Sequence, residues 1–216
     1  MDIAILIYDR FTALDAVGPY EVLSRLPGAQ VTFVAERTGP IRTDTGQLGL
    51  LADATLAEHE HPEIVLIPGG PGQVALMGDG PVHEWLRGAH ETSTWTTSVC
   101  TGSLILAAAG LLEGKRATSN WQALDELREF GVEVVPERVM FDGKLATSAG
   151  VTAGIDMALT LVERIAGPEL AQAIQLGIEY DPEPPFDAGS PEKAPAEIVE
   201  AVRAYSRFTA EQASLT

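Results

Sequence analysis

The fold is decided by the stretch from Thr94 to Leu112, which reads Thr94-Trp-Thr-Thr-Ser-Val-Cys100-Thr-Gly-Ser-Leu-Ile-Leu-Ala-Ala-Ala-Gly-Leu-Leu112. Its first part is rich in β-branched residues, its second part in Ala and Leu, and the change falls at Cys100. We therefore predict a strand that ends at Cys100 and a helix that begins at Thr101. Helix N-terminal amides favour a thiolate and lower the pKa of a thiol beside them. The position favours a nucleophile, although a free cysteine is also commonly a small buried apolar residue.

The alternation of strand and helix continues on both sides of this stretch. Apolar runs predict strands at 3–8, 31–36, 63–67, 132–136 and 140–148, the last with a turn at Asp142-Gly143. Helical spacing predicts helices that begin at Gly18-Pro19, at Thr152 and at Pro195, while the proline-rich segment 180–191 is irregular. This pattern predicts an α/β fold with a flavodoxin-like, doubly wound, mostly parallel sheet flanked by helices and a cysteine nucleophile elbow. No break in composition divides the chain, so we expect one domain over residues 1–216.

Composition and charge narrow the possible functions. The 216 residues are 45% hydrophobic and 21% charged, which is typical of a folded, soluble protein. A formal charge of −17 repels phosphate backbones and anionic lipid, so we expect no nucleic-acid partner. The longest apolar runs are too short to span a bilayer, and Asp2 stands where a signal peptide needs positive charge, so we expect no membrane association and a cytoplasmic location. Cys100 is the one cysteine, which excludes an internal disulfide and a multi-cysteine metal site.

Two further elements are expected at the same edge of the sheet as Cys100. The loop Ile67-Pro-Gly69-Gly70-Pro-Gly offers amides that could bind negative charge developing on a substrate, although a plain strand-to-helix turn explains it equally well. Asp15 follows the first strand, in the connection before the predicted helix. An acid there is often solvated or caps a helix. Because all three elements follow buried parallel strands, we expect Asp15, Gly69, Gly70 and Cys100 to line one crevice.

These stretches resemble the DJ-1/PfpI superfamily, and within it they are most similar to the isocyanide hydratases. The superfamily resemblance is carried by Ser98-Val-Cys-Thr-Gly-Ser-Leu104, by Ile67-Pro-Gly-Gly70 and by Leu14-Asp-Ala-Val-Gly-Pro-Tyr-Glu-Val22. The narrower similarity is carried by segments 100–118, 150–159 and 179–191. The cysteine elbow is shared by enzymes, chaperones and regulators, so it indicates the fold more firmly than the reaction.

One departure from the superfamily concerns the base. Many members carry a histidine about twenty residues after the cysteine, where this chain has Ala117-Thr-Ser-Asn120-Trp. The four histidines all precede Cys100, and we interpret them as solvated, with His59 and His61 spaced as an adventitious metal site could be. A Cys-His-acid protease or amidotransferase needs an imidazole, so those activities are disfavoured. We expect no cofactor and no metal.

The resemblance to isocyanide hydratases implies a reaction that needs no histidine. Cys100 would attack the terminal carbon of a small-molecule isocyanide, and Asp15 would act as general acid and base on the way to a thioimidate and an N-substituted formamide. Thr101 would supply its hydroxyl or its amide to the sulfur, although it serves equally well as a helix-start residue. Asp15 and Cys100 would share one proton. The resemblance also implies a homodimer.

Other functions remain open from the sequence. The same thiol could act in a glyoxalase-like or amidase-like enzyme, or as a redox sensor without turnover. The 25 residues after Pro191 are too few for a helix-turn-helix domain, which disfavours a DNA-binding regulator. Trp121, Phe186 and Leu104 could line an apolar cavity, but core positions are the simpler interpretation. The proline-rich tail could cover a pocket, and we slightly favour a structural role for it.

Overall fold

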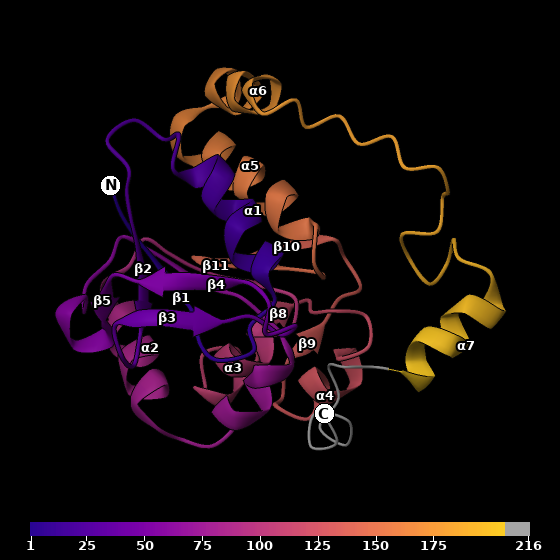
Figure 1. The fold of residues 1–216 in the computed structure, drawn as a ribbon, viewed down its shortest axis with the longest axis horizontal. Helices are drawn as coiled ribbons and strands as arrows, with labels where there is room; N and C mark the ends of the chain where they lie inside the picture. The colour runs from indigo at the N-terminus through magenta and orange to yellow at the C-terminus, as the bar shows by residue number, and fades with distance from the viewer. Residues whose placement is uncertain (206–216) are drawn as a thin grey trace.

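A seven-stranded sheet forms the centre of the computed structural model, which describes residues 1–205 (Figure 1). Its strands are β1 (Asp2–Leu6), β2 (Gln30–Ala35), β5 (Ala54–Thr55), β6 (Ile64–Ile67), β7 (Trp95–Val99), β10 (Val139–Asp142) and β11 (Leu145–Ser148). They lie in the order β10-β11-β7-β6-β1-β2-β5, and every pair is parallel except β10 with β11. Two small sheets lie outside it: antiparallel β3 (Gly39–Arg42) with β4 (Gly49–Ala52), and parallel β8 (Arg116–Ala117) with β9 (Glu133–Val134).

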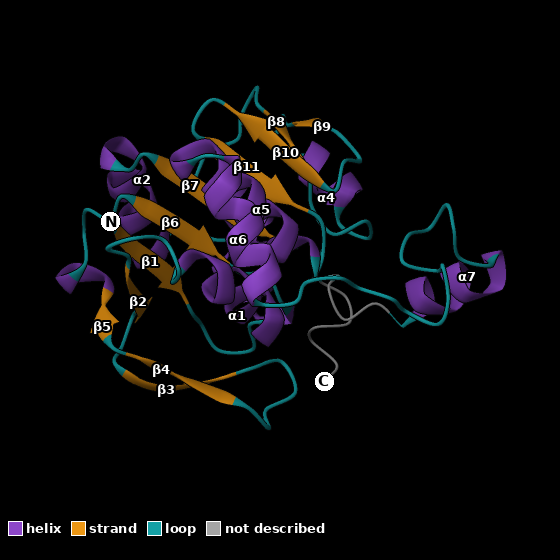
Figure 2. Ribbon diagram, turned by 90° about the horizontal axis from the view of Figure 1, so that it is seen from above, coloured by secondary structure: helices purple, strands orange, loops and turns teal. Residues whose placement is uncertain are grey.

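Helices cover both faces of the main sheet (Figures 1 and 2). One face carries α1 (Ala13–Leu23) and α5 (Ala153–Ala166), with α6 (Pro168–Gly177) packed on α5. The other carries α2 (Pro81–Thr92) and α3 (Gly102–Ala108), and α4 (Leu124–Arg128) contacts α3. Short 3₁₀ turns are η1 (Leu56–Glu58) and η2 (Pro71–Leu76), and α7 (Ala196–Ala204) follows a long irregular segment. The architecture is the expected doubly wound α/β fold.

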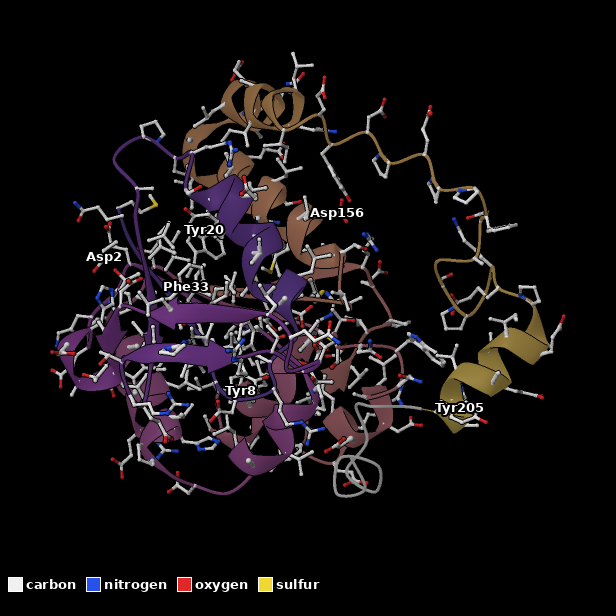
Figure 3. All side chains as sticks on the ribbon, in the orientation of Figure 1. Asp2, Tyr8, Tyr20, Phe33, Asp156 and Tyr205 are labelled. Atoms are coloured by element: carbon white, nitrogen blue, oxygen red, sulfur yellow. The ribbon has the colours of Figure 1, made fainter. Side chains whose placement is uncertain are left out.

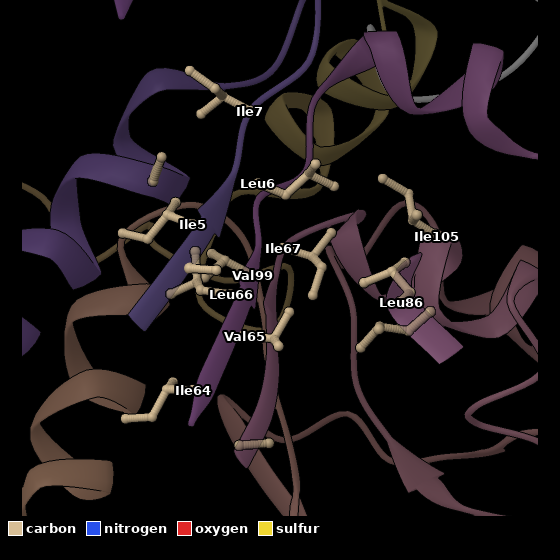
Figure 4. Packing of buried hydrophobic residues seen from close by; sticks show 14 of the residues in the cluster. Ile5, Leu6, Ile7, Ile64, Val65, Leu66, Ile67, Leu86, Val99 and Ile105 are labelled. Atoms are coloured by element: carbon tan, nitrogen blue, oxygen red, sulfur yellow. The ribbon is translucent and has the colours of Figure 1, made fainter. Parts of the chain in front are cut away.

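The core is built from strands that are apolar on both faces. Ile5 pairs in register with Leu66, and both point toward α1 and α5. Leu6 and Ile67 point to the opposite face, where Figure 4 shows them beside residues of α2 and α3. All four side chains are fully buried. A strand buried on both sides needs this continuous apolar pattern, which is why these runs identified the sheet.

The strand order places a switch point between β1 and β6. From β1 the chain first adds β2 and β5 on one side, then crosses to add β6, β7 and β11 on the other. Connections leave the sheet in opposite directions at such a point, which opens a crevice beyond the carboxyl ends of the strands. The segments that follow β1, β6 and β7 carry Asp15, Gly69 and Cys100, so the topology brings these residues together.

Several sequence predictions need correction. Helix α1 begins at Ala13 and contains Pro19, whereas the sequence predicted a start at Gly18-Pro19. Pro19 removes one helical hydrogen bond, but the close packing of α1 on α5 outweighs that loss. Asp15 therefore lies in the first turn of a helix and not in a connection. The strand predicted at 132–136 is only β9, and it pairs with β8 outside the main sheet.

Three further predictions, for the segments after residue 139, match the structure. The turn at Asp142-Gly143 joins β10 to β11, and segment 180–191 carries no helix or strand. The predicted last helix is α7, and the end of that prediction, 206–208, lies outside the described residues. Within residues 1–205, no helix has both the length and the apolar character needed to cross a bilayer.

Two helical glycines give a test of this packing. A Cβ on Gly154 would lie 2.9 Å from a methyl of Val99 and 3.0 Å from the ring of Pro19, whereas a Cβ on Gly88 in α2 meets no heavy atom within 4 Å. Gly154→Ala should therefore lower the free energy of unfolding by about 1–3 kcal/mol through overpacking. Gly88→Ala should raise it by about 0.5–1 kcal/mol through helix propensity. Urea unfolding measures both, and equal effects of the two substitutions would contradict the packing described.

Candidate active site

Cys100 occupies a sharp turn between β7 and α3. Its backbone φ is 57°, a left-handed conformation that costs a non-glycine residue about 1–3 kcal/mol. Hydrogen bonds to both the amide and the carbonyl of Cys100 hold this turn in place. The Cys100 amide donates to the carbonyl of Ser148 at 3.0 Å, and its carbonyl accepts from the hydroxyls of Ser103 at 3.1 Å and Ser119 at 3.0 Å. Such a fixed, strained elbow is typical of a nucleophile that a fold presents at the end of a strand.

The glycine-rich loop after β6 presses directly against this elbow. A Cβ on Gly69 would lie 2.5 Å from the Thr101 amide nitrogen and 2.9 Å from the Cys100 Cβ, so only glycine fits there. The Gly69 amide donates to Asp15 Oδ2 at 2.9 Å, and the Gly70 amide donates to Thr101 Oγ1 at 3.0 Å. From the sequence, these two amides were expected to bind negative charge that develops on a substrate. In this structure they hold two candidate catalytic side chains in place.

Asp15 reaches the sulfur from the first turn of α1. Asp15, Thr101 and Cys100 are all fully buried, with 0% of each residue exposed. The Asp15 carboxyl lies near enough to the Cys100 sulfur to raise the pKa of the thiol. Tyr8, two residues after β1, donates its hydroxyl to the carbonyl of Pro68 at 2.9 Å. Burial, together with the charges of Asp15 and Cys100, raises the pKa of Tyr8 well above its usual value, so this hydroxyl stays protonated beside the pair.

Asn120 completes the surroundings of the sulfur from the loop after β8. Its Oδ1 accepts the Gln122 amide at 3.0 Å, which leaves the Nδ2 group to donate to the Cys100 sulfur. Gly150, after β11, makes room for this contact. A Cβ there would lie 2.4 Å from Asn120 Nδ2 and 3.1 Å from the sulfur. Asn120 can stabilise negative charge on sulfur, but its amide cannot remove a proton.

The electrostatics of the thiol differ from the sequence prediction. Burial and the nearby Asp15 carboxylate raise the pKa of the Cys100 thiol well above its ordinary value. Hydrogen bonds from the Thr101 amide and the Asn120 side chain act in the opposite direction, but they are outweighed. The helix-terminal amide of Thr101 lowers the pKa as expected and Asp15 raises it, and the loss of hydration of a fully buried sulfur decides the net direction. Burial and the Asp15 carboxyl therefore favour the protonated form of the Cys100 thiol.

The structure therefore brings together Cys100, Asp15, Thr101, Gly69 and Gly70. Sequence reasoning missed Tyr8, Asn120 and Gly150 as parts of the site. For Asn120 a signal was present, since it stands where many superfamily members carry histidine.

The histidines lie elsewhere, and they are not uniformly solvated as predicted. His83 is buried, His59 lies 3.1 Å from Asp2, and His90 is half-buried with its Nδ1 2.8 Å from the Thr96 hydroxyl. Each sits on or beside a helix that packs against the domain, which buries part of its ring. Among residues 1–205, no three His, Cys, Asp or Glu side chains gather closely enough to hold a metal ion.

Comparisons with known proteins agree with this geometry. A profile of the DJ-1/PfpI family matches residues 1–164. The chain belongs to the DJ-1/PfpI family. The match covers the cysteine elbow, the glycine-rich loop that packs on it and the acid on the first helix.

Individual relatives fall within the same family. An isonitrile hydratase of Pseudomonas putida is 43% identical over 203 residues, which cover 94% of this chain and 89% of the relative. A solved structure of a ThiJ/PfpI family protein from Pseudomonas syringae superposes with a TM-score of 0.93 at 37% identity, covering 99% of this chain and 90% of that one. A glutathione-independent glyoxalase of Caenorhabditis elegans is 26% identical over 149 residues, covering 68% of this chain and 79% of the relative.

The coupling of Asp15 to Cys100 can be tested without a substrate. Because the carboxylate raises the pKa of the thiol, Asp15→Asn should lower that pKa, and alkylation of Cys100 by iodoacetamide should reach its maximal rate at a lower pH. The single cysteine makes intact-mass spectrometry a direct measure of the reaction. Asp125→Asn removes an exposed acid paired with Arg128 and serves as the matched control. Identical pH profiles for the two variants would exclude the coupling.

Proposed function

We propose that this protein hydrates isocyanides to N-substituted formamides, with Cys100 as nucleophile and Asp15 as general acid and base. The observation that carries the proposal is the buried Cys100–Asp15 pair, which has an amide, Asn120, where an imidazole would otherwise assist the sulfur. The similarity to an isonitrile hydratase supports it, since isonitrile and isocyanide name the same functional group.

The first step uses the proton that the pair already holds. An isocyanide, R–N≡C, has an electrophilic terminal carbon and no leaving group. As the sulfur attacks this carbon, Asp15 takes the thiol proton and delivers it to the same carbon, which gives the thioimidate R–N=CH–S–Cys100. A high thiol pKa suits this step, because the thiol remains protonated until a substrate arrives and the proton is then available for transfer.

The second step consumes one water molecule. Asp15, again a carboxylate, removes a proton from water as its oxygen bonds to the thioimidate carbon, and the substrate nitrogen gains a proton. The C–S bond then breaks, the sulfur recovers a proton, and R–NH–CHO leaves. Isocyanide and water are thus converted to the formamide, and Asp15 and Cys100 return to their starting protonation.

The neighbouring groups orient the pair and stabilise charge. We assign to the Thr101 amide and the Asn120 side chain the stabilisation of the sulfur whenever it carries negative charge, since both donate to it in the resting state. The Gly69 and Gly70 amides act by positioning Asp15 and Thr101.

Burial of the sulfur also favours this substrate class. Cys100 has no exposed surface, and Gly150, Asn120 and Gly69 lie close around it, so an electrophile must reach an enclosed sulfur. An isocyanide presents its reactive carbon at the end of a linear group, whereas an amide carbonyl carries substituents on both sides of the reacting carbon. The shape of the site therefore suits isocyanides better than amides.

A homodimer remains part of the proposal. Exposed apolar side chains on the β4 hairpin region, Leu48 and Leu51, offer surface that a second copy could cover. Sedimentation analysis of the purified protein tests the stoichiometry.

Catalysis should depend on both members of the pair. Cys100→Ser should abolish formamide formation from cyclohexyl isocyanide, and Asp15→Asn should lower kcat by about 10²–10⁴-fold because proton transfer is lost. Formamide production followed by chromatography measures both rates, and circular dichroism confirms that the variants are folded. Asp125→Asn should retain the parental rate. Undiminished turnover by Asp15→Asn would remove the acid–base role assigned to this carboxyl.

The same preparation distinguishes other uses of the thiol. Consumption of methylglyoxal or of a primary amide in preference to isocyanides would place the reaction elsewhere among DJ-1/PfpI activities. Failure to turn over every electrophile, with reversible oxidation of Cys100, would favour a redox sensor.

A further inference from the structure

A cavity of about 300 Å³ lies between the body of the domain and the segment that follows α6. We call residues 180–195 the strap. Figure 1 shows the strap leaving α6 and running to α7, which stands apart from the sheet and its flanking helices. The inner wall of the cavity includes Ser119, Ala149 and Gly150, and the outer wall is formed by strap residues 189–192. The volume is at the lower end of the range of about 300–1,000 Å³ found for small-ligand sites.

The inner wall of this cavity is also the immediate shell of the nucleophile. Ser119 donates to the Cys100 carbonyl, and Ala149 accepts from the Cys100 amide at 3.3 Å. Gly150 separates the cavity from the sulfur with backbone alone, since its missing Cβ would stand 3.1 Å from that atom. A group bound in the cavity is therefore one glycine away from Cys100.

The strap is tied to the domain at its start by the Tyr180 hydroxyl, which donates to Asp156 Oδ1 at 3.1 Å, and beyond its end by contacts of α7. The Gln122 side chain donates to the carbonyl of Val202 in α7 at 3.1 Å, and the Arg203 guanidinium lies over the Trp121 ring at 5.3 Å. Trp121 also lines the cavity itself. Tyr205, at the end of α7, is largely exposed, and Figure 3 shows it well away from Tyr8 in the body of the domain. The strap thus forms the outer wall of the cavity, and Trp121 lies between this wall and the domain.

Resting on the hydratase function proposed above, we propose that this cavity binds the N-substituent of the isocyanide, and that the strap sets the size of substituent that is accepted. The lining contains both apolar and polar groups. Its apolar surface comes from Trp121, Leu124, Pro136 and Pro191. An aromatic or alicyclic ring is the substituent that such a lining fits, because one flat indole and two proline rings give extended apolar contact.

The charges at the cavity favour a neutral substituent. Glu137, Glu192 and Arg138 all line it. Arg138 is already paired with Asp156 and donates to the Thr152 hydroxyl, so its charge is offset. Hydrogen bonds from its own amide and from Ser190 lower the pKa of Glu192, which keeps this carboxylate ionised. Two carboxylates without a second cation repel an anionic ligand, as does the net charge of the chain.

Gly189 provides a substitution that fills the cavity without disturbing the chemistry. Gly189 lines the cavity, and a Cβ there meets no heavy atom within 4 Å, so a larger side chain can be introduced at this wall without a clash at its Cβ. In Gly189→Phe, the ratio of kcat/KM for cyclohexyl isocyanide to kcat/KM for methyl isocyanide should fall by at least about tenfold, because only the ring competes with the new side chain. Gly78→Phe, at an exposed loop glycine that also has no neighbour within 4 Å, should leave the ratio unchanged.

The outcomes separate this inference from the proposed function. Equal loss for both substrates, or an unchanged ratio in Gly189→Phe, would overturn the role of the strap. Absence of formamide from every isocyanide in the parent protein would instead overturn the hydratase function. Alkylation of Cys100 then still tests the cavity, since it needs no turnover.

The alkylation experiment compares reagents that differ in size or in charge. Gly189→Phe should slow labelling of Cys100 by N-benzyl iodoacetamide more than labelling by iodoacetamide. Each labelling rate is divided by the rate of the same reagent with glutathione. After this correction, iodoacetate should label the parent protein more slowly than iodoacetamide. Glu137→Gln should reduce the difference between the two corrected rates. If none of the three reagents labels Cys100, the cavity does not lead to the sulfur. If Gly189→Phe slows labelling by the two neutral reagents equally, the strap does not select by size.

Discussion

The contact between the loop after β6 and the elbow after β7 is the constraint on which the site depends. Gly69 has no space for a Cβ because the Thr101 amide and the Cys100 Cβ occupy it. This proximity lets one backbone amide hold the Asp15 carboxyl, and the next one hold the Thr101 hydroxyl. Segments from three different parts of the chain thereby converge on one sulfur. A side chain at position 69 would separate the nucleophile from the groups that control its proton.

Opposing influences meet at the Cys100 sulfur. Burial and the Asp15 charge raise the pKa of the thiol, and the hydrogen bonds from Thr101 and Asn120 lower it. Asn120 Oδ1 is committed to the Gln122 amide, so the side chain faces the sulfur only as a donor. Asn120 can therefore donate to the sulfur but cannot take a proton from it, which disfavours a mechanism that needs a base at this position.

The sequence was most informative where the signal is local. The change from β-branched residues to Ala and Leu marks the elbow at Cys100, and unbroken apolar runs mark strands that are buried on both faces. It failed where packing between distant segments decides the outcome. Pro19 implied a helix start, but contact of α1 with α5 carries the helix through it. The roles of Asn120 and Gly150 depend on their meeting at Cys100 from separate loops, and neither type of residue signals such a meeting by itself.

The strap also changes how selection can act on this protein. Segment 180–191 contains no helix or strand, and the hydrogen bond of Gln122 to Val202 and the stacking of Arg203 on Trp121 tie the helix beyond it to the domain. Substitutions and length changes in such a segment cost little folding free energy. The machinery around the sulfur, by contrast, tolerates almost no added atoms. Sequence divergence can therefore accumulate in this outer wall at little cost to the fold that holds the sulfur in place.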